Sequence, residues 1–142
     1  MAAERWEALA RIEQPAYAAL RSVAGAAFSF HGMQKVFGWL AEGAGPAVGS
    51  QLWFGGVIEL VCGVLIALGL FARPAAFLAS GTMAVAYIQF HWKLAFAGWK
   101  WLPAINHGEL ALIYCFLFLF IAGHGSGPAS VDARVGRGAS GR

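Results

Sequence analysis

The sequence predicts an all-α integral membrane protein, a bundle of four membrane-spanning helices with both the N- and C-termini in the cytoplasm. Three observations predict this fold class. Of the 142 residues, 59% are hydrophobic and 12% are charged, whereas soluble domains carry about 25% charged residues. Four mostly apolar stretches each approach the roughly 20 residues that a spanning helix needs. Finally, the arginines gather on one side of the predicted bundle.

The elements follow in order along the chain. In residues 1–15 apolar positions recur every three residues among Arg and Glu, which predicts an amphipathic segment, with an unstructured end as the alternative. The predicted membrane domain is 16–124. Its four helices are expected at about 16–39, 52–72, 74–96 and 106–123. The remaining segment, 125–142, is rich in Gly, Ser and Arg, so we expect a cytoplasmic tail that is solvated and partly disordered.

The distribution of charge predicts the orientation. Four crossings place both chain ends and the turn before the third helix on one side. This side collects Arg5, Arg11, Arg21, Arg73, Arg134, Arg137 and Arg142. By the positive-inside rule it is the cytoplasmic side. Five tryptophans then fall at the outer boundary, which suits an amphipathic indole: Trp39, Trp53, Trp92, Trp99 and Trp101.

Polar side chains within the predicted spans indicate the candidate site. Placing such groups in hydrocarbon costs free energy unless they are paired or hydrated. We therefore expect them to converge inside the outer half of the bundle. Lys35 and Glu59 are the predicted pair, because the small residues Gly55 and Gly63 flank Glu59 and let another helix approach. The full predicted pocket for a ligand or proton comprises His31, Gln34, Lys35, Glu59, Gln89, His91, Asn106 and Glu109.

The residues leave two interpretations of this cluster open. It can be an ion-pair network that only sets the register of the helices, or a pocket that binds a small polar head or relays protons. A haem between His31 and His91 is disfavoured, because their estimated depths differ and each helix supplies one histidine. No metal site is expected, although His31, His91, Glu59 and Glu109 are residue types that can bind a metal. The separated cysteines Cys62 and Cys115 indicate no redox pair.

Arg21, Arg73 and Asp132 are the structural candidates on the cytoplasmic side. Both arginines approach the inner interface, and Asp132 is the nearest acidic residue after the fourth helix. A pair between Asp132 and either arginine would fold the start of the tail under the bundle. The alternative is that each arginine extends to the lipid headgroups.

Several segments occur in a characteristic order. They are Arg21, HGMQKVFG (31–38), GGVIELVCGVLIALGLFAR (55–73), His91, NHGE (106–109) and AGHGSGPASVD (122–132). In this order and spacing the sequence resembles the DoxX family of small bacterial membrane proteins. The resemblance implies a multi-pass protein of the bacterial inner membrane. It marks the following as family features without an established catalytic role: Arg21, Gly32, Lys35, Gly38, Glu59, Gly63, Gly69, Arg73, Glu109 and Asp132.

The resemblance also implies a role beside redox enzymes, because family members look like membrane parts of quinol oxidases, thiosulfate:quinone oxidoreductases or oxidative-stress complexes. The first hypothesis is therefore an accessory or quinone-interacting subunit of a membrane redox system. Without a redox-active cysteine pair, a non-catalytic subunit is favoured over a stand-alone oxidoreductase. No intrinsic cofactor is expected, and a quinone is the candidate ligand.

Two alternatives belong to other functional classes. One is a small-molecule or proton-coupled carrier, which with only four helices would require a homodimer. The other is a structural subunit of a larger membrane complex. The expected partners are the lipid bilayer and such a membrane or redox complex, and nothing in the sequence resembles a nucleic-acid-binding module.

Overall fold

The computed structural model describes residues 7, 10–41 and 43–139. Part of the predicted amphipathic segment, together with Arg5 and Arg142, lies outside the described residues. Every regular element in the described part is helical, which confirms the all-α prediction. The four longest elements there are α2 (Glu13–Phe37), α3 (Gln51–Leu68), α4 (Ala72–Ala86) and α6 (Glu109–His124). Shorter ones are a π-helical turn (Tyr87–Trp92), a 3₁₀ turn (Ala97–Trp99), α5 (Pro103–Asn106) and α7 (Val131–Ala139).

Local signals set the ends of these helices. The Ser50 hydroxyl accepts a hydrogen bond from the Trp53 N–H at 3.2 Å and so caps the start of α3. Gly38 and Gly69 end α2 and α3 in the left-handed conformation, with φ of 68° and 67°, which glycine adopts without a steric penalty. Phe71, before α4, also has a left-handed φ of 48°. Because non-glycine residues rarely adopt this conformation, the turn into α4 needs support from elsewhere.

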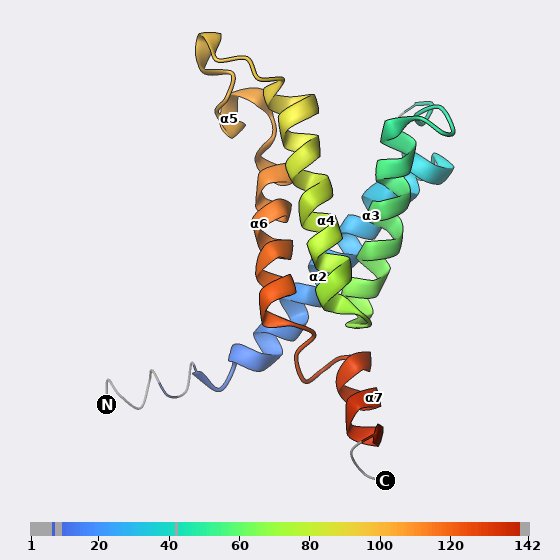
Figure 1. Cartoon of the computed structure of the whole chain (residues 1–142), viewed down its shortest axis with the longest axis vertical. Coiled ribbons are helices and arrows are strands. Elements are labelled where there is room, and N and C mark those ends of the chain that lie inside the picture. The colour runs from blue at the N-terminus through green and yellow to red at the C-terminus, as the bar shows by residue number, and fades with distance from the viewer. Residues whose placement is uncertain (1–6, 8–9, 42, 140–142) are drawn as a thin grey trace.

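The long helices form two pairs, α2 with α3 and α4 with α6, which lie close together at one end and diverge at the other (Figure 1). We call the end that holds the chain termini the closed end. The opposite end, which carries the loops 38–50 and 93–108, is the open end. Within the first pair the two backbones touch, since a Cβ added to Gly25 would collide with the backbones of Gly63 and Ala67. Small residues at such contacts are typical of membrane helix pairs.

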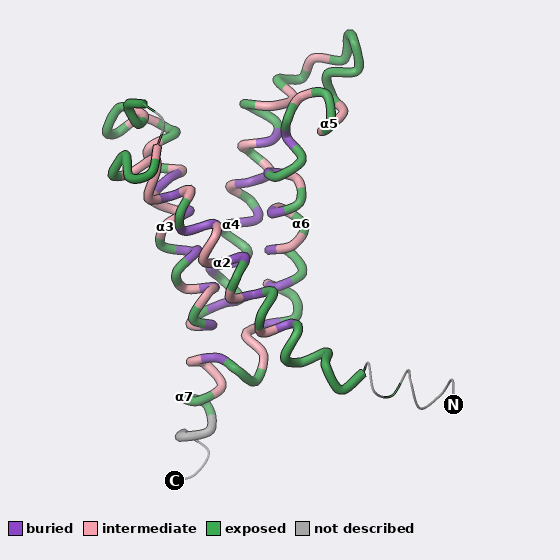
Figure 2. Tube along the Cα trace, turned by 180° about the vertical axis from the view of Figure 1, so that it is seen from behind, coloured by how far each residue is buried: buried purple, intermediate pink, exposed green. Residues whose placement is uncertain are grey.

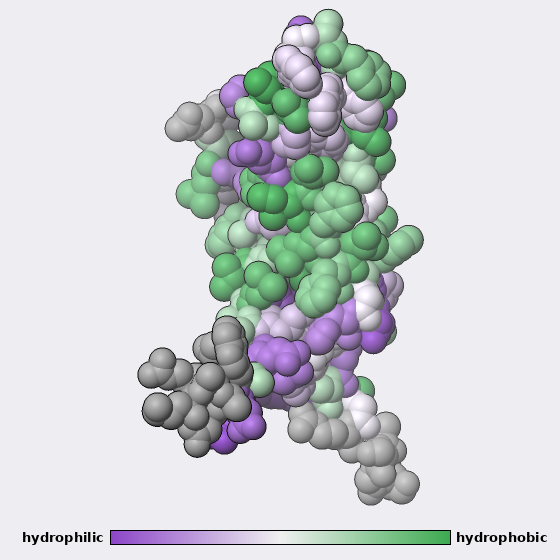
Figure 3. Space-filling view, turned by 90° about the vertical axis from the view of Figure 1, so that its left-hand side faces the viewer, coloured by the Kyte–Doolittle hydropathy of each residue, from purple (hydrophilic) through white to green (hydrophobic). Residues whose placement is uncertain are grey.

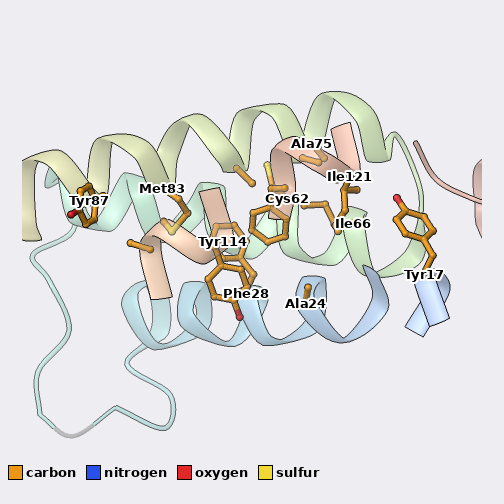
Figure 4. Packing of buried hydrophobic residues seen from close by; sticks show 14 residues of the cluster. Tyr17, Ala24, Phe28, Cys62, Ile66, Ala75, Met83, Tyr87, Tyr114 and Ile121 are labelled. Carbon is orange, nitrogen blue, oxygen red and sulfur yellow. The ribbon is translucent and has the colours of Figure 1, made fainter. Parts of the chain in front are cut away.

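The core lies where the two pairs meet. Phe28 of α2, Ile66 of α3, and Phe118 and Ile121 of α6 are each at most 1% exposed. The rings of Phe28 and Phe118 pack edge to face with centroids 4.7 Å apart, and Tyr114 stacks beside them (Figure 4). Buried positions therefore face inward between the pairs, while the loops at the open end are largely exposed (Figure 2).

A broad apolar surface covers the middle of the face shown in Figure 3, with hydrophilic residues gathered toward the closed end. Large exposed side chains on three different helices include Val23, Phe77 and Phe116. An apolar surface of this extent indicates contact with lipid. Within the described residues, Gln51–Leu68 is by itself long and apolar enough to cross a membrane, and Glu109–His124 is apolar but shorter.

Several boundaries differ from the predicted ones. Helix α2 starts at Glu13, inside the predicted amphipathic segment. The third predicted helix stops at Trp92, because Lys93 and Leu94 adopt left-handed φ values of 55° and 54°. The fourth starts at Glu109, because His107 has a φ of 59° and breaks the helix.

Within the tail predicted to be partly disordered, Val131–Ala139 forms the helix α7, which the sequence did not predict. The start of α7 is tied to the bundle, because the Asp132 N–H donates to Gly69 O at 3.1 Å. Helix propensity from composition missed this segment because a distant contact supports it.

Candidate functional site

A groove of about 790 Å³ lies between the two helix pairs. Along α4 and the π-helical turn its lining extends from Phe77 to His91, a length of roughly 20 Å at the rise of an α-helix. Leu52, Phe54 and Leu78 also line the groove and are 43%, 57% and 51% exposed. The groove therefore opens along its side to the apolar surface between α3 and α4, and not only at the open end of the bundle.

Most polar side chains of this mostly apolar groove lie toward the open end. The charged, amide and imidazole groups are His31, Lys35, Gln51, Glu59, His91 and His107, and Thr82 and Tyr114 add two hydroxyl groups. Deeper in the groove the lining is Phe28, Ile58, Phe77, Leu78 and Met83. The groove is thus polar at one end and apolar along the rest of its length.

Lys35 and Glu59 form the ion pair that their helix positions predict. Lys35 Nζ lies 2.5 Å from Glu59 Oε1. Glu59 is 2% exposed, whereas the side chain of Lys35 is 34% exposed and so remains accessible from the groove. Gly56 makes this possible, because a Cβ at Gly56 would occupy the space of the Lys35 stem.

The second carboxylate oxygen of Glu59 has no such partner. Oε2 is buried and accepts no hydrogen bond from any residue that the structure describes. Buried polar groups are almost always hydrogen-bonded, and a charged acceptor without a donor is especially costly. Glu59 is among the residues that line the groove, so this acceptor without a donor lies at the groove wall.

A π-helical turn positions the histidine on the opposite wall. His91 belongs to Tyr87–Trp92, and its Nδ1 lies 3.2 Å from Asn106 O. Tyr87 donates from its hydroxyl to Trp101 O at 2.5 Å and so holds this turn against the loop at the open end. Such π-helical turns occur frequently at functional sites, because the wider turn redirects side chains.

Four predicted pocket residues lie outside the groove. The Gln34 side chain donates to Leu40 O at 3.1 Å, and the Gln89 side chain accepts from Gln51 Nε2 at 2.5 Å. Asn106 Oδ1 accepts from the Gly108 N–H at 2.8 Å and so stabilises the turn before α6. Glu109 is exposed in the first turn of α6. These side chains serve helix ends and loops, because the helices end earlier than predicted.

The prediction omitted Gln51 and His107, which line the groove, and also the hydroxyl-bearing Thr82 and Tyr114. Gln51 is the first residue of an otherwise apolar helix, and His107 belongs to the NHGE segment. Both sit at the boundaries of predicted spans, where a polar residue is usually attributed to solvent contact. Within the described residues, no three His, Cys, Asp or Glu side chains lie together in a way that could hold a metal ion.

At the closed end, Arg21 is 1% exposed and corrects both predictions made for it. It does not extend to the headgroups, and among the described residues it forms no hydrogen bond with Asp132. Its guanidinium donates to three backbone carbonyls instead, Ile66 O at 2.6 Å, Ala67 O at 2.8 Å and Ala129 O at 2.6 Å. Arg21 therefore joins the end of α3 to the segment before α7.

Arg73 has a similar role at the neighbouring helix end. Its Nη1 donates to Ala122 O at 3.0 Å and Gly123 O at 2.6 Å, and its Nη2 donates to His124 O at 3.3 Å. These are the last carbonyls of α6, which have no partners within the helix. A cation at a helix C-terminus also interacts favourably with the helix dipole.

Asp132 caps the start of α4 from a distant part of the chain. Its carboxylate accepts from the N–H groups of Phe71 at 3.0 Å and Ala72 at 3.4 Å, and from the Ser126 hydroxyl. The hydrogen bond from Ser126 lowers the pKa of Asp132, as do the two N–H groups, and together they outweigh the opposing effect of partial burial. The tail does fold under the bundle as expected, although not through an arginine pair.

Comparisons with known proteins agree with these features. The DoxX family model matches residues 16–92, a range that includes Arg21, Lys35, Glu59 and His91. An uncharacterized protein of Haemophilus influenzae is 42% identical over 116 residues, which cover 80% of this chain and 85% of that protein. No solved structure matches the chain. On this evidence the chain belongs to the DoxX family of membrane proteins.

Proposed function

We propose that this protein is a multi-pass protein of the bacterial inner membrane whose groove binds the head of a membrane quinone. In this role it is an accessory subunit of a membrane redox system. The observation that carries the proposal is the groove itself, which is apolar along most of its length and ends in the Lys35–Glu59 pair.

The proposed topology has four crossings, by α2, α3, α4 with its π-helical turn, and α6. The first helix crosses in spite of Lys35, because Glu59 pairs with this charge within the bundle. The closed end carries Arg21, Arg73 and Arg134, so it faces the cytoplasm with both chain termini. In this orientation the groove opens toward the outer leaflet.

The polarity of the groove supports an amphiphilic ligand. A quinone has a polar ring and an apolar tail, and the groove offers polar side chains near the open end and apolar ones below. The tail would lie against Phe77 and Leu78, which are themselves exposed to lipid. A quinone could therefore enter sideways from the bilayer, between α3 and α4. A volume of about 790 Å³ suffices for a ring and the first part of its tail.

The side chains at the polar end supply the hydrogen bonds that a quinone ring needs. The ammonium group of Lys35 keeps further N–H donors beyond the one directed at Glu59. The imidazoles of His31 and His91 can donate or accept, depending on their tautomers. Glu59 is the proton acceptor of the site.

The packed core between the groove and the closed end favours ligand binding over a carrier role. A carrier needs a route from one side of the membrane to the other. Phe28, Ile66 and Phe118 are at most 1% exposed and fill the space below the groove. This packing closes the groove toward the closed end, so the groove is accessible from its side and from the open end but does not continue through the bundle, which supports ligand binding.

Co-purification tests this function. The protein is extracted in mild detergent, and its bound quinone is measured per mole of protein. We expect the wild type to retain quinone and Gly81→Leu to lose most of it, because Gly81 lines the groove and a Cβ there meets nothing within 4 Å. The leucine side chain would extend from this open position and occupy part of the groove.

Gly123→Leu is the matched control. A Cβ at Gly123 also meets nothing within 4 Å, but Gly123 lies at the end of α6, outside the groove. This variant should retain quinone like the wild type. A wild-type protein without quinone, which also brings down no redox enzyme on affinity purification, would contradict the proposal.

A further inference from the structure

We infer that the groove binds the reduced, hydroxyl-bearing quinol in preference to the oxidised quinone, and that Glu59 makes this distinction. The inference rests on the proposed function and specifies which redox form the site takes. The observation that supports it is the hydrogen bonding of one buried carboxylate, that of Glu59.

The two oxygens of Glu59 differ in their environment. Oε1 lies 2.5 Å from Lys35 Nζ, whereas Oε2 is buried and accepts no hydrogen bond from any described residue. The whole residue is 2% exposed and lines the groove. The site therefore holds a buried carboxylate oxygen at the groove wall to which no described residue donates.

The two redox forms meet this acceptor differently. A carboxylate only accepts hydrogen bonds, and the carbonyl oxygen of a quinone also only accepts. A quinone oxygen next to Oε2 would leave both groups without a donor and would repel the charge. A quinol hydroxyl donates to Oε2, and hydrogen bonds to a charged acceptor are the strong ones.

Lys35 completes the recognition of a hydroxyl group. Its ammonium has three N–H donors, one of which is directed at Glu59 Oε1. A hydroxyl oxygen can accept from Lys35 while its hydrogen is donated to Glu59. A carbonyl oxygen can accept from Lys35 but leaves Oε2 unsatisfied.

The other titratable groups that line the groove do not discriminate between the two forms. These groups are His31, His91, His107 and Tyr114. Imidazoles and phenols both donate and accept, so they can adapt to a carbonyl or a hydroxyl. The preference for quinol is thus assigned to Glu59 alone.

Binding of matched ligands tests the inference. The purified full-length protein in lipid nanodiscs is titrated with decylubiquinone and, anaerobically, with decylubiquinol. We expect the quinol to bind roughly tenfold or more tightly, as the loss of one hydrogen bond to a charged group predicts. In Glu59→Gln the preference should disappear, because the amide both donates and accepts.

Glu109→Gln is the control, since Glu109 is exposed and lies outside the groove. It should keep the wild-type preference. A second measurement needs no variant: the dimethyl ether of decylubiquinol, which has no hydroxyl donor, should bind as weakly as the quinone.

The possible outcomes distinguish the preference for quinol from the proposed quinone site itself. Equal binding of quinol, quinone and ether by the wild type overturns the selection by Glu59 and leaves the quinone site standing. Failure of all three ligands to bind overturns both the inference and the proposed function. Tighter binding of quinol that Glu59→Gln does not reduce assigns the preference to another residue and overturns the role of Glu59.

Discussion

The two ends of the bundle each bury a charged side chain, but they treat it differently. At the closed end, the Arg21 guanidinium donates to three backbone carbonyls. At the open end, Glu59 has one oxygen paired with Lys35 and one without a donor. The first arrangement uses its charge to hold segments together, and the second keeps hydrogen-bonding capacity beside a groove. An intramembrane charge therefore indicates a ligand site only when its partners are incomplete.

The glycines show the same contrast. Gly25 and Gly63 bring the backbones of α2 and α3 into contact, so a Cβ at either would collide with the neighbouring helix. Gly55 and Gly81 line the groove, and a Cβ at either meets nothing within 4 Å. Glycine thus serves close packing in one region and leaves open space in the other.

The largest expected effect on stability is that of Arg21→Met, which removes the Arg21 hydrogen bonds at the closed end. The carbonyls of Ile66, Ala67 and Ala129 would lose their donor, and the free energy of unfolding should fall by about 3 kcal/mol or more. Unfolding by sodium dodecyl sulfate from mild detergent measures this change. Arg21→Lys should recover only part of the loss, because an ammonium group lacks the planar fork of donors. Wild-type stability in Arg21→Met would mean that these bonds do not hold the closed end.

A smaller effect is expected from a matched pair of alanine substitutions in α3. Gly63→Ala forces the added methyl group against the backbone of Gly25 and Ser29, which should cost about 1–3 kcal/mol. Gly55→Ala meets open space, so it should be neutral or stabilise by about 0.5–1 kcal/mol through its higher helix propensity. The same detergent-unfolding assay compares them. Equal losses from both would contradict the open groove.

The smallest effect concerns the cap that Asp132 provides to α4. Its pKa is lower in the folded protein than the ordinary value of 3.8, chiefly because of the hydrogen bond from Ser126. Its contribution to stability is therefore fully present above that ordinary value and is lost as the pH falls through the lowered pKa. Asp132→Asn should cost about 1 kcal/mol near neutral pH.

The pH dependence provides the check on this cap. The stability difference between wild type and Asp132→Asn should shrink as the pH falls from 5 toward about 2. Ser126→Ala offers a comparison, because it removes the first-named cause of the shift and should move the wild-type transition toward higher pH. A stability difference that stays constant over this range would exclude a titrating cap.

The sequence predicted the main ion pair, but only half of the residues predicted for the pocket line the groove. Lys35 and Glu59 could be paired because helical spacing places them on facing sides, and Gly63 does contact α2 as predicted. The role predicted for Gly55 is wrong, because Gly55 faces open space and Gly56 accommodates the Lys35 stem. Gln34, Gln89 and Asn106 lie outside the groove, since each sits where a helix ends or a loop turns. Hydropathy locates such ends only within a few residues.

The partners of the two arginines could not be predicted. Arg21 and Arg73 bind backbone carbonyls, and every residue carries the same carbonyl, so no sequence pattern marks the acceptors. Asp132 is the nearest acidic residue after the fourth helix, but in the structure its carboxylate caps the start of α4. The position of Asp132 depends on the final segment, which returns to the bundle after the seven preceding helices and helical turns of the described chain.

The sequence by itself determined the helical class, the membrane environment and the pairing of Lys35 with Glu59, because composition, periodicity and small-residue spacing are local properties. Only the tertiary structure decided that the two helix pairs meet at one end and diverge at the other. That divergence creates the groove and leaves Glu59 Oε2 without a donor. It arises from contacts between segments far apart in the chain, such as Arg21 with Ala129, which local patterns do not encode.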